Sequence, residues 1–119
     1  MTKDLTCTII PYFQVQEGKL EAFKNIVTQM VEQTKSESKC CYYSFYFNEN
    51  TAFCREAYEG AEGVLEHIEK VGPLLEKSLT LAEMTFLEVH GPSDELAKLK
   101  EPLAELNPRY FELECGFKK

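Results

Sequence analysis

The segment FCREAYEGAEGVLEH, residues 53–67, decides the fold that this sequence predicts. Phe53–Tyr58 predicts a strand, Glu59-Gly60 a turn, and an amphipathic helix is expected from Ala61 onward. Among these fifteen residues are the ionisable side chains of Arg55, Glu56 and His67 and the phenol of Tyr58, so a functional site is expected here.

Upstream of this segment, the sequence predicts a strand and then a helix. Leu5–Gln16 is rich in β-branched and aromatic residues, which are typical of a strand. Pro11 has no N–H to donate to a neighbouring strand, so we expect it at a sheet edge or at a bulge. From Lys19 to Ser36, apolar residues recur at steps of three and four, which predicts a helix with one buried face. These residues are Leu20, Phe23, Ile26, Val27, Met30 and Val31.

The stretch CCYYSFYFNEN, residues 40–50, predicts a second strand that ends in a hairpin turn. Aromatic residues and cysteines follow one another with few polar residues between them, so both faces of this strand are expected to be covered. Asn48–Asn50 is the expected turn, and Thr51–Tyr58 returns as the partner strand.

Downstream, a second long helix is expected over Ala61–Val71. Gly72-Pro73 is expected to break it before a short helix at Leu74–Ser78, because proline removes a helical hydrogen bond but suits a first helical position. Leu79–His90 then predicts a fourth strand.

The C-terminal part predicts an extra helix and an extra strand. Ser93 suits the N-cap of a helix, and Pro102 predicts a kink within it. Tyr110–Phe117 alternates apolar and acidic residues, which predicts a half-buried strand.

The predicted order is β-α-β-β-α-β with an appended helix and strand, which is the ferredoxin-like α+β arrangement with an antiparallel sheet. Residues 1–119 are expected to form one domain, with its core over about residues 5–90 and a C-terminal extension over about 93–117. The two helices cover one sheet face, which leaves the aromatic residues of the other face without a cover. We therefore expect a homodimer whose sheets pack face to face, since a twofold contact uses the same patch on both subunits.

Charge and composition narrow the function classes. A net charge of −7 and a pI near 4.9 exclude nucleic acid and anionic membrane surfaces as expected partners. No apolar run approaches the roughly 18 residues of a membrane span, and the N-terminus lacks the apolar core of a signal peptide, so a cytoplasmic protein is expected. The five cysteines lack metal-ligand spacing, which predicts free thiols and no metal site. Cys54, beside Arg55, is the one candidate for a reactive thiol.

The segment REAYEGAEGVLEHI resembles the antibiotic biosynthesis monooxygenase family of the dimeric α/β-barrel superfamily. Members of this family carry a Glu on the third strand, a Trp or Tyr two residues later, a short turn, and an Ala/Leu-rich helix that ends in a His. The matching positions here are Glu56, Tyr58, Glu59-Gly60, Val64-Leu65 and His67.

The resemblance implies a dimeric α/β barrel with a cleft between sheet and helices in each protomer. In active relatives the cleft holds a polycyclic phenol, a quinol or, in one branch, haem. Those enzymes need neither flavin nor metal, because the electron-rich substrate itself reacts with dioxygen. Haem is not implied here, since the haem-degrading relatives need a Trp that this chain lacks.

Two functions stay open. The first is a cofactor-independent monooxygenase-like enzyme for a small aromatic or quinol compound, with His67 as the catalytic base and Tyr58 orienting the substrate. Glu56 and Arg55 are further substrate-binding candidates, although neighbours on a strand point to opposite faces and cannot both line one cleft. The second is a non-catalytic homodimer that binds a small apolar ligand or a partner protein. Relatives commonly carry a Trp in the pocket and a second His a few residues after the helical one, where this chain has Val71-Gly72-Pro73. The absence of both residues favours the second function, and the Glu-x-Tyr…His segment favours the first.

Overall fold

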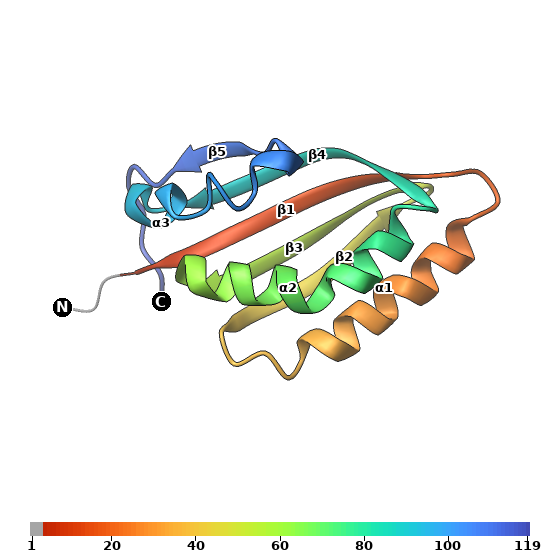
Figure 1. The fold of residues 1–119 in the computed structure, drawn as a ribbon, viewed down its shortest axis with the longest axis horizontal. Coiled ribbons are helices and arrows are strands. Elements are labelled where there is room, and N and C mark those ends of the chain that lie inside the picture. The colour runs from red at the N-terminus through yellow and green to blue at the C-terminus, as the bar shows by residue number, and fades with distance from the viewer. Residues whose placement is uncertain (1–3) are drawn as a thin grey trace.

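The computed structural model describes residues 4–119, which form one five-stranded sheet with the two long helices packed on the same face (Figure 1). The elements are β1 Thr6–Val15, α1 Leu20–Thr34, β2 Cys40–Asn48, β3 Thr51–Glu59, α2 Gly60–Ser78, β4 Ala82–Gly91, α3 Ser93–Ala97, the 3₁₀ helix η1 Ala104–Leu106, and β5 Arg109–Glu112.

The strand order β2-β3-β1-β4-β5 confirms the ferredoxin-like α+β fold. Strands β1 to β4 pair antiparallel, and β5 adds to the edge as a parallel neighbour of β4. In the central strand β1, Ile9 lies opposite Glu56 of β3 and Val89 of β4, and all three side chains are buried. Because side chains alternate along a strand, this register fixes which residues of each strand face the helices.

Of the two expectations about proline, the one for Pro11 is confirmed and the one for Pro73 is wrong. Pro11 lies in the central strand β1 and not at a sheet edge, but a register shift against β4 follows it between Tyr12 and Phe13, so the expected bulge is present. Pro73 does not break the second helix, because α2 runs from Gly60 to Ser78 with Pro73 inside it. The buried face of α2 continues past the proline to Ser78, and this tertiary packing prevails over local helix propensity.

The C-terminal extension is less regular than predicted. Helix α3 ends at Ala97, and turns with the short helix η1 replace the expected kinked helix. β5 ends at Glu112, so the predicted strand over Tyr110–Phe117 is wrong beyond that residue. Leu113 and Phe117 are 53% and 85% exposed, because β5 is an edge strand and no other part of the chain covers them.

Two hydrophobic clusters form the core. One joins the start of α2 to the C-terminal extension and includes Val64, Val89 and Leu103. The other joins α1 to the opposite end of the sheet and includes Phe13, Phe23 and Val27. The candidate site lies where these two clusters meet.

The sheet face away from the helices carries an aromatic strip. Tyr42, Tyr46 and Phe86 are 43%, 44% and 56% exposed. Within the strip, the Tyr46 and Phe53 rings stack at 5.0 Å between centroids, and the Arg55 guanidinium lies 5.9 Å from the Tyr46 ring. No helix among residues 4–119 has both the length and the apolar character of a membrane span.

Candidate functional site

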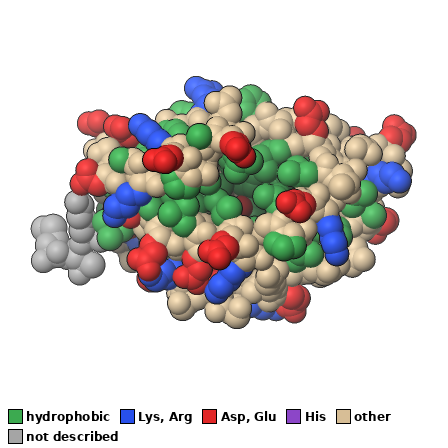
Figure 2. All heavy atoms as spheres, viewed as in Figure 1, with side chains coloured by type: hydrophobic (Ala, Val, Ile, Leu, Met, Phe, Trp, Pro, Cys, Tyr) green, Lys and Arg blue, Asp and Glu red, His purple; other side chains and the backbone are tan. Residues whose placement is uncertain are grey.

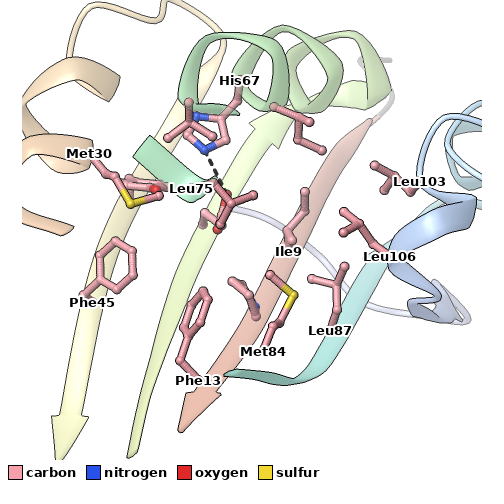
Figure 3. A pocket seen from close by; sticks show the side chains of 15 residues that line it. Ile9, Phe13, Met30, Phe45, His67, Leu75, Met84, Leu87, Leu103 and Leu106 are labelled. Atoms are coloured by element: carbon pink, nitrogen blue, oxygen red, sulfur yellow. Dashed lines mark ion pairs between the residues drawn. The ribbon is translucent and has the colours of Figure 1, made fainter. Parts of the chain in front are cut away.

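An apolar cavity of about 50 Å³ lies between the helix-facing side of the sheet, α2 and the C-terminal extension. Hydrophobic side chains gather around a hollow on this face of the molecule (Figure 2). Met30 and Phe45 lie on one side of the cavity, and Leu103 and Leu106 lie on the other (Figure 3). The other apolar lining residues are Ile9, Pro11, Phe13, Ile68, Val71, Leu75, Met84 and Leu87.

The C-terminal extension therefore caps the cavity. Leu103 is buried and Leu106 is 38% exposed, so the wall runs from the core out to the surface. The volume is below the roughly 300 Å³ of pockets that hold a drug-sized ligand. A bound molecule of that size thus requires part of the cavity lining to move. The part formed by Leu103 and Leu106 consists only of turns and the three-residue 3₁₀ helix η1.

The polar end of the cavity is built on β3 by Glu56 and Tyr58. Glu56 is 5% exposed, and its Oε1 accepts a hydrogen bond of 2.5 Å from the Tyr58 hydroxyl. Burial raises the pKa of Glu56 to about 7, although hydrogen bonds from Tyr58 and Cys54 act in the opposite direction. A carboxyl group with this pKa is both a usable acid and a usable base at neutral pH.

His67 and Glu37 complete this polar end. His67 projects from α2, and its Nδ1 lies 3.0 and 3.2 Å from the two carboxylate oxygens of Glu37, which precedes β2. The two side chains are only 4% and 2% exposed. Burial lowers the pKa of His67 to about 4, and burial raises the pKa of Glu37.

His67 and Glu56 face each other across the end of the cavity. The His67 Nε2 and Glu56 Oε1 atoms are 3.6 Å apart, which is too long for a hydrogen bond (Figure 3). Both residues line the cavity. A substrate oxygen about 2.8 Å from each atom would fit this separation and bond to both. The arrangement can therefore pass a proton between a bound molecule and either side chain.

The structure brings together three of the four predicted site residues. Glu56 and His67 line the cavity, whereas Tyr58 is fully buried and contacts Glu56 from outside the lining. Arg55 is not part of this site: it is exposed on the opposite sheet face, over the rings of Tyr42 and Tyr46.

Sequence reasoning missed two residues of the site. Tyr43 of β2 lines the cavity with its ring 5.0 Å from that of His67. It pairs with Glu56 in the β2–β3 register, so strand alternation was the signal that could have found it. Glu37 lies in the polar SESK turn, and nothing in that sequence marks it.

The thiols do not join the site chemistry. Cys54, the expected candidate, is 1% exposed, and burial raises the pKa of its thiol far above the ordinary value, so it is not an activated thiolate. All five cysteines are free, and residues 4–119 contain no cluster of three or more His, Cys, Asp or Glu side chains that could hold a metal ion.

No protein-family model matches the sequence, and no curated protein matches it significantly. Among solved structures, MupZ from Pseudomonas fluorescens is similar over 100% of this chain and 93% of its own, with 41% identity and a TM-score of 0.94.

More distant structures share the fold. A candidate antibiotic biosynthesis monooxygenase from Nitrosomonas europaea has 18% identity and a TM-score of 0.68, over 76% of this chain and 93% of its own. An antibiotic biosynthesis monooxygenase has 14% identity and a TM-score of 0.62, over 70% of this chain and 92% of its own.

At 41% identity over the whole chain, this protein belongs to the same family as MupZ. It shares its fold with antibiotic biosynthesis monooxygenases.

Proposed function

We propose that this chain is a cofactor-independent enzyme that transfers a proton to or from a small apolar compound bound in the cavity. The observation that carries the proposal is the buried group of four polar side chains at the end of an aliphatic cavity, Glu37, His67, Glu56 and Tyr58. Perturbed ionisable groups of this kind, converging on a concave apolar site, are typical of acid–base catalysis.

Within this proposal, Glu56 is the proton-transfer residue. Its pKa of about 7 matches neutral pH, whereas a His67 with a pKa of about 4 is a weaker base. Tyr58 donates to Glu56 and orients its carboxyl group. His67 accepts or returns the proton from the other side of the bound molecule.

The fold shared with antibiotic biosynthesis monooxygenases suggests oxidation by dioxygen as one reaction that begins with such a proton transfer. Removal of a proton from a phenol or quinol yields an anion that reacts with dioxygen, and the apolar cavity keeps water away from it. Oxygen consumption across a panel of quinols tests this form, with Glu56→Gln expected to abolish it and His67→Ala expected to reduce it. Unchanged consumption in Glu56→Gln would remove the mechanism even where activity exists.

A second candidate is acid–base catalysis without oxidation, such as an isomerisation or an addition. The observation that favours it is the pair of proton-transfer groups 3.6 Å apart, because one can protonate an atom while the other deprotonates its neighbour. Turnover under anaerobic conditions separates the two candidates.

We also propose that the aromatic strip of the outer sheet face pairs with a second copy of this chain. Its support is the exposure of Tyr42, Tyr46 and Phe86 on a single face, which an isolated subunit would leave in water. A non-catalytic dimer that binds a ligand or a partner protein is the alternative, and the small cavity volume favours its partner-protein form. Loss of turnover in Glu56→Gln would exclude that alternative.

A further inference from the structure

We propose that Glu37 is a positioning residue that holds the imidazole of His67 in the tautomer protonated at Nδ1, so that Nε2 presents a lone pair to Glu56 and to the cavity. The catalytic consequence of this assignment rests on the proposed function, but the assignment itself concerns only the state of the imidazole.

The contact between the two residues is short and well shielded. Both oxygens of Glu37 lie within 3.2 Å of Nδ1, and both side chains are almost fully buried. An oxygen acceptor on one imidazole nitrogen determines which nitrogen carries the proton, because the protonated nitrogen makes that hydrogen bond. The remaining nitrogen, Nε2, is the one that faces Glu56 at 3.6 Å.

The backbone around Glu37 is held in place, as a positioning residue requires. The Glu37 N–H donates to the Thr34 carbonyl at 3.0 Å, and the Glu37 carbonyl accepts from the Cys40 N–H at 3.2 Å. The turn is thereby tied both to α1 and to the start of β2. A side chain that projects from such a turn reaches His67 without depending on the cavity's contents.

Among the described residues, the other side chains that contact the imidazole approach its Nε2 atom or pack against the ring as aromatic contacts. Glu56 approaches from β3 on the Nε2 side. The Tyr43 and Tyr58 rings approach the imidazole with centroids at 5.0 and 5.1 Å, as ring contacts. The tautomer therefore follows from Glu37 alone. With the proton on Nδ1, His67 accepts a proton at Nε2, and the Glu37 carboxylate stabilises the imidazolium that forms.

The direct test is the ring ¹⁵N spectrum of His67. The chain has two histidines, so His90→Gln leaves His67 as the only imidazole and serves as the common background. At pH 7 we expect a protonated Nδ1 and an unprotonated Nε2. In that background, Glu37→Met removes the acceptor at similar side-chain length, and we expect the major tautomer to change to Nε2–H, which can then donate to Glu56.

Three results would overturn the assignment: an Nε2–H tautomer in the background protein, a doubly protonated ring there at pH 7, or an unchanged tautomer in Glu37→Met. Should Glu37→Met not fold, the spectrum of the background protein decides by itself. Turnover is a separate measurement, in which Glu37→Met is expected to lower kcat roughly 10- to 100-fold with little change in KM. If the tautomer changes but turnover does not, the proposed function fails and the positioning role stands.

Discussion

Replacement of Glu56 by Gln should make the protein more stable at neutral and alkaline pH relative to the wild type. The carboxyl group is 5% exposed, and its pKa rises from an ordinary value of 4.5 to about 7. Between these two pH values the unfolded chain loses the proton of Glu56 while the folded chain keeps it. The wild type therefore loses stability as pH rises through this window, and the Gln variant does not.

The size of the effect follows from the pKa change. At about 1.4 kcal/mol per pKa unit, ionisation of buried Glu56 costs about 3 kcal/mol by pH 8. This is a large part of the 5–15 kcal/mol that stabilises a typical domain, so it is readily measured; a shift in Tm on the order of 10 °C is expected for a chain of this size. His67 titrates in both proteins, so its contribution largely cancels in the difference between them.

Urea unfolding followed by circular dichroism, at pH 4.5, 6 and 8 and one protein concentration, measures this difference. The free energy of unfolding of Glu56→Gln minus that of wild type should increase by about 3 kcal/mol across the series. Glu59→Gln is the matched control, because it removes an exposed carboxylate from the end of the same strand and should follow the wild type at every pH. A stability difference between Glu56→Gln and wild type that is the same at all three pH values would refute the reasoning.

Outcomes are expected for four further variants. Phe86→Glu, which places a charge on the exposed aromatic strip, should convert a dimer into a monomer in sedimentation velocity; a wild type that is already monomeric would contradict the proposed interface. Gly63→Ala should destabilise by about 1–3 kcal/mol, since a Cβ there would lie 3.0 Å from side-chain carbons of Lys39 and Tyr58. Gly72→Ala in the same helix meets nothing within 4 Å and should stabilise by about 0.5–1 kcal/mol in the same urea assay, so effects of equal sign would count against the packing described. His67→Gln should remove a loss of stability, up to about 3 kcal/mol, that the wild type shows as pH falls from 6.5 toward 4, because burial lowers the pKa of His67 to about 4 and the unfolded chain takes up the proton first.

The strands and long helices were predictable because their residues repeat with a period. The alternation in β1 and the three- and four-residue steps in α1 each follow from a single buried face. Pro73 shows the limit of local rules, because a helix packed along its whole buried face continues through a residue that would end it in isolation. Tyr110–Phe117 shows that a strand-like pattern does not suffice to form a strand. Its residues alternate as in a strand, but after Glu112 no neighbouring strand is paired with them.

The candidate site was predictable only where it lies within one continuous segment. Glu56 and Tyr58 lie on β3, and His67 lies on α2, which follows β3 directly in the sequence. The packing of this helix against its neighbouring strand therefore brings the three residues close. Glu37 is 30 residues from His67 and reaches it only after α1 has packed against the sheet. Glu37 differs from the exposed Glu residues of the chain only in being buried. Burial is a property of the fold, so the sequence alone does not single out Glu37.

Burial of the four polar side chains at the end of the cavity lowers the stability of the folded protein. This cost to stability supports the proposal that the four side chains serve a reaction. Apolar side chains at positions 56 and 67 would extend the aliphatic lining. Together with an apolar side chain at position 37, they would remove the desolvation penalty of two carboxyl groups and an imidazole. Replacement of buried ionic groups by apolar residues is often neutral or stabilising by about 1–4 kcal/mol. If the interactions of this network outweighed the cost of burying it, Glu56→Gln would be destabilising at every pH. The raised pKa of Glu56 predicts the opposite sign at pH 8, where the folded protein holds a charge that its interior disfavours.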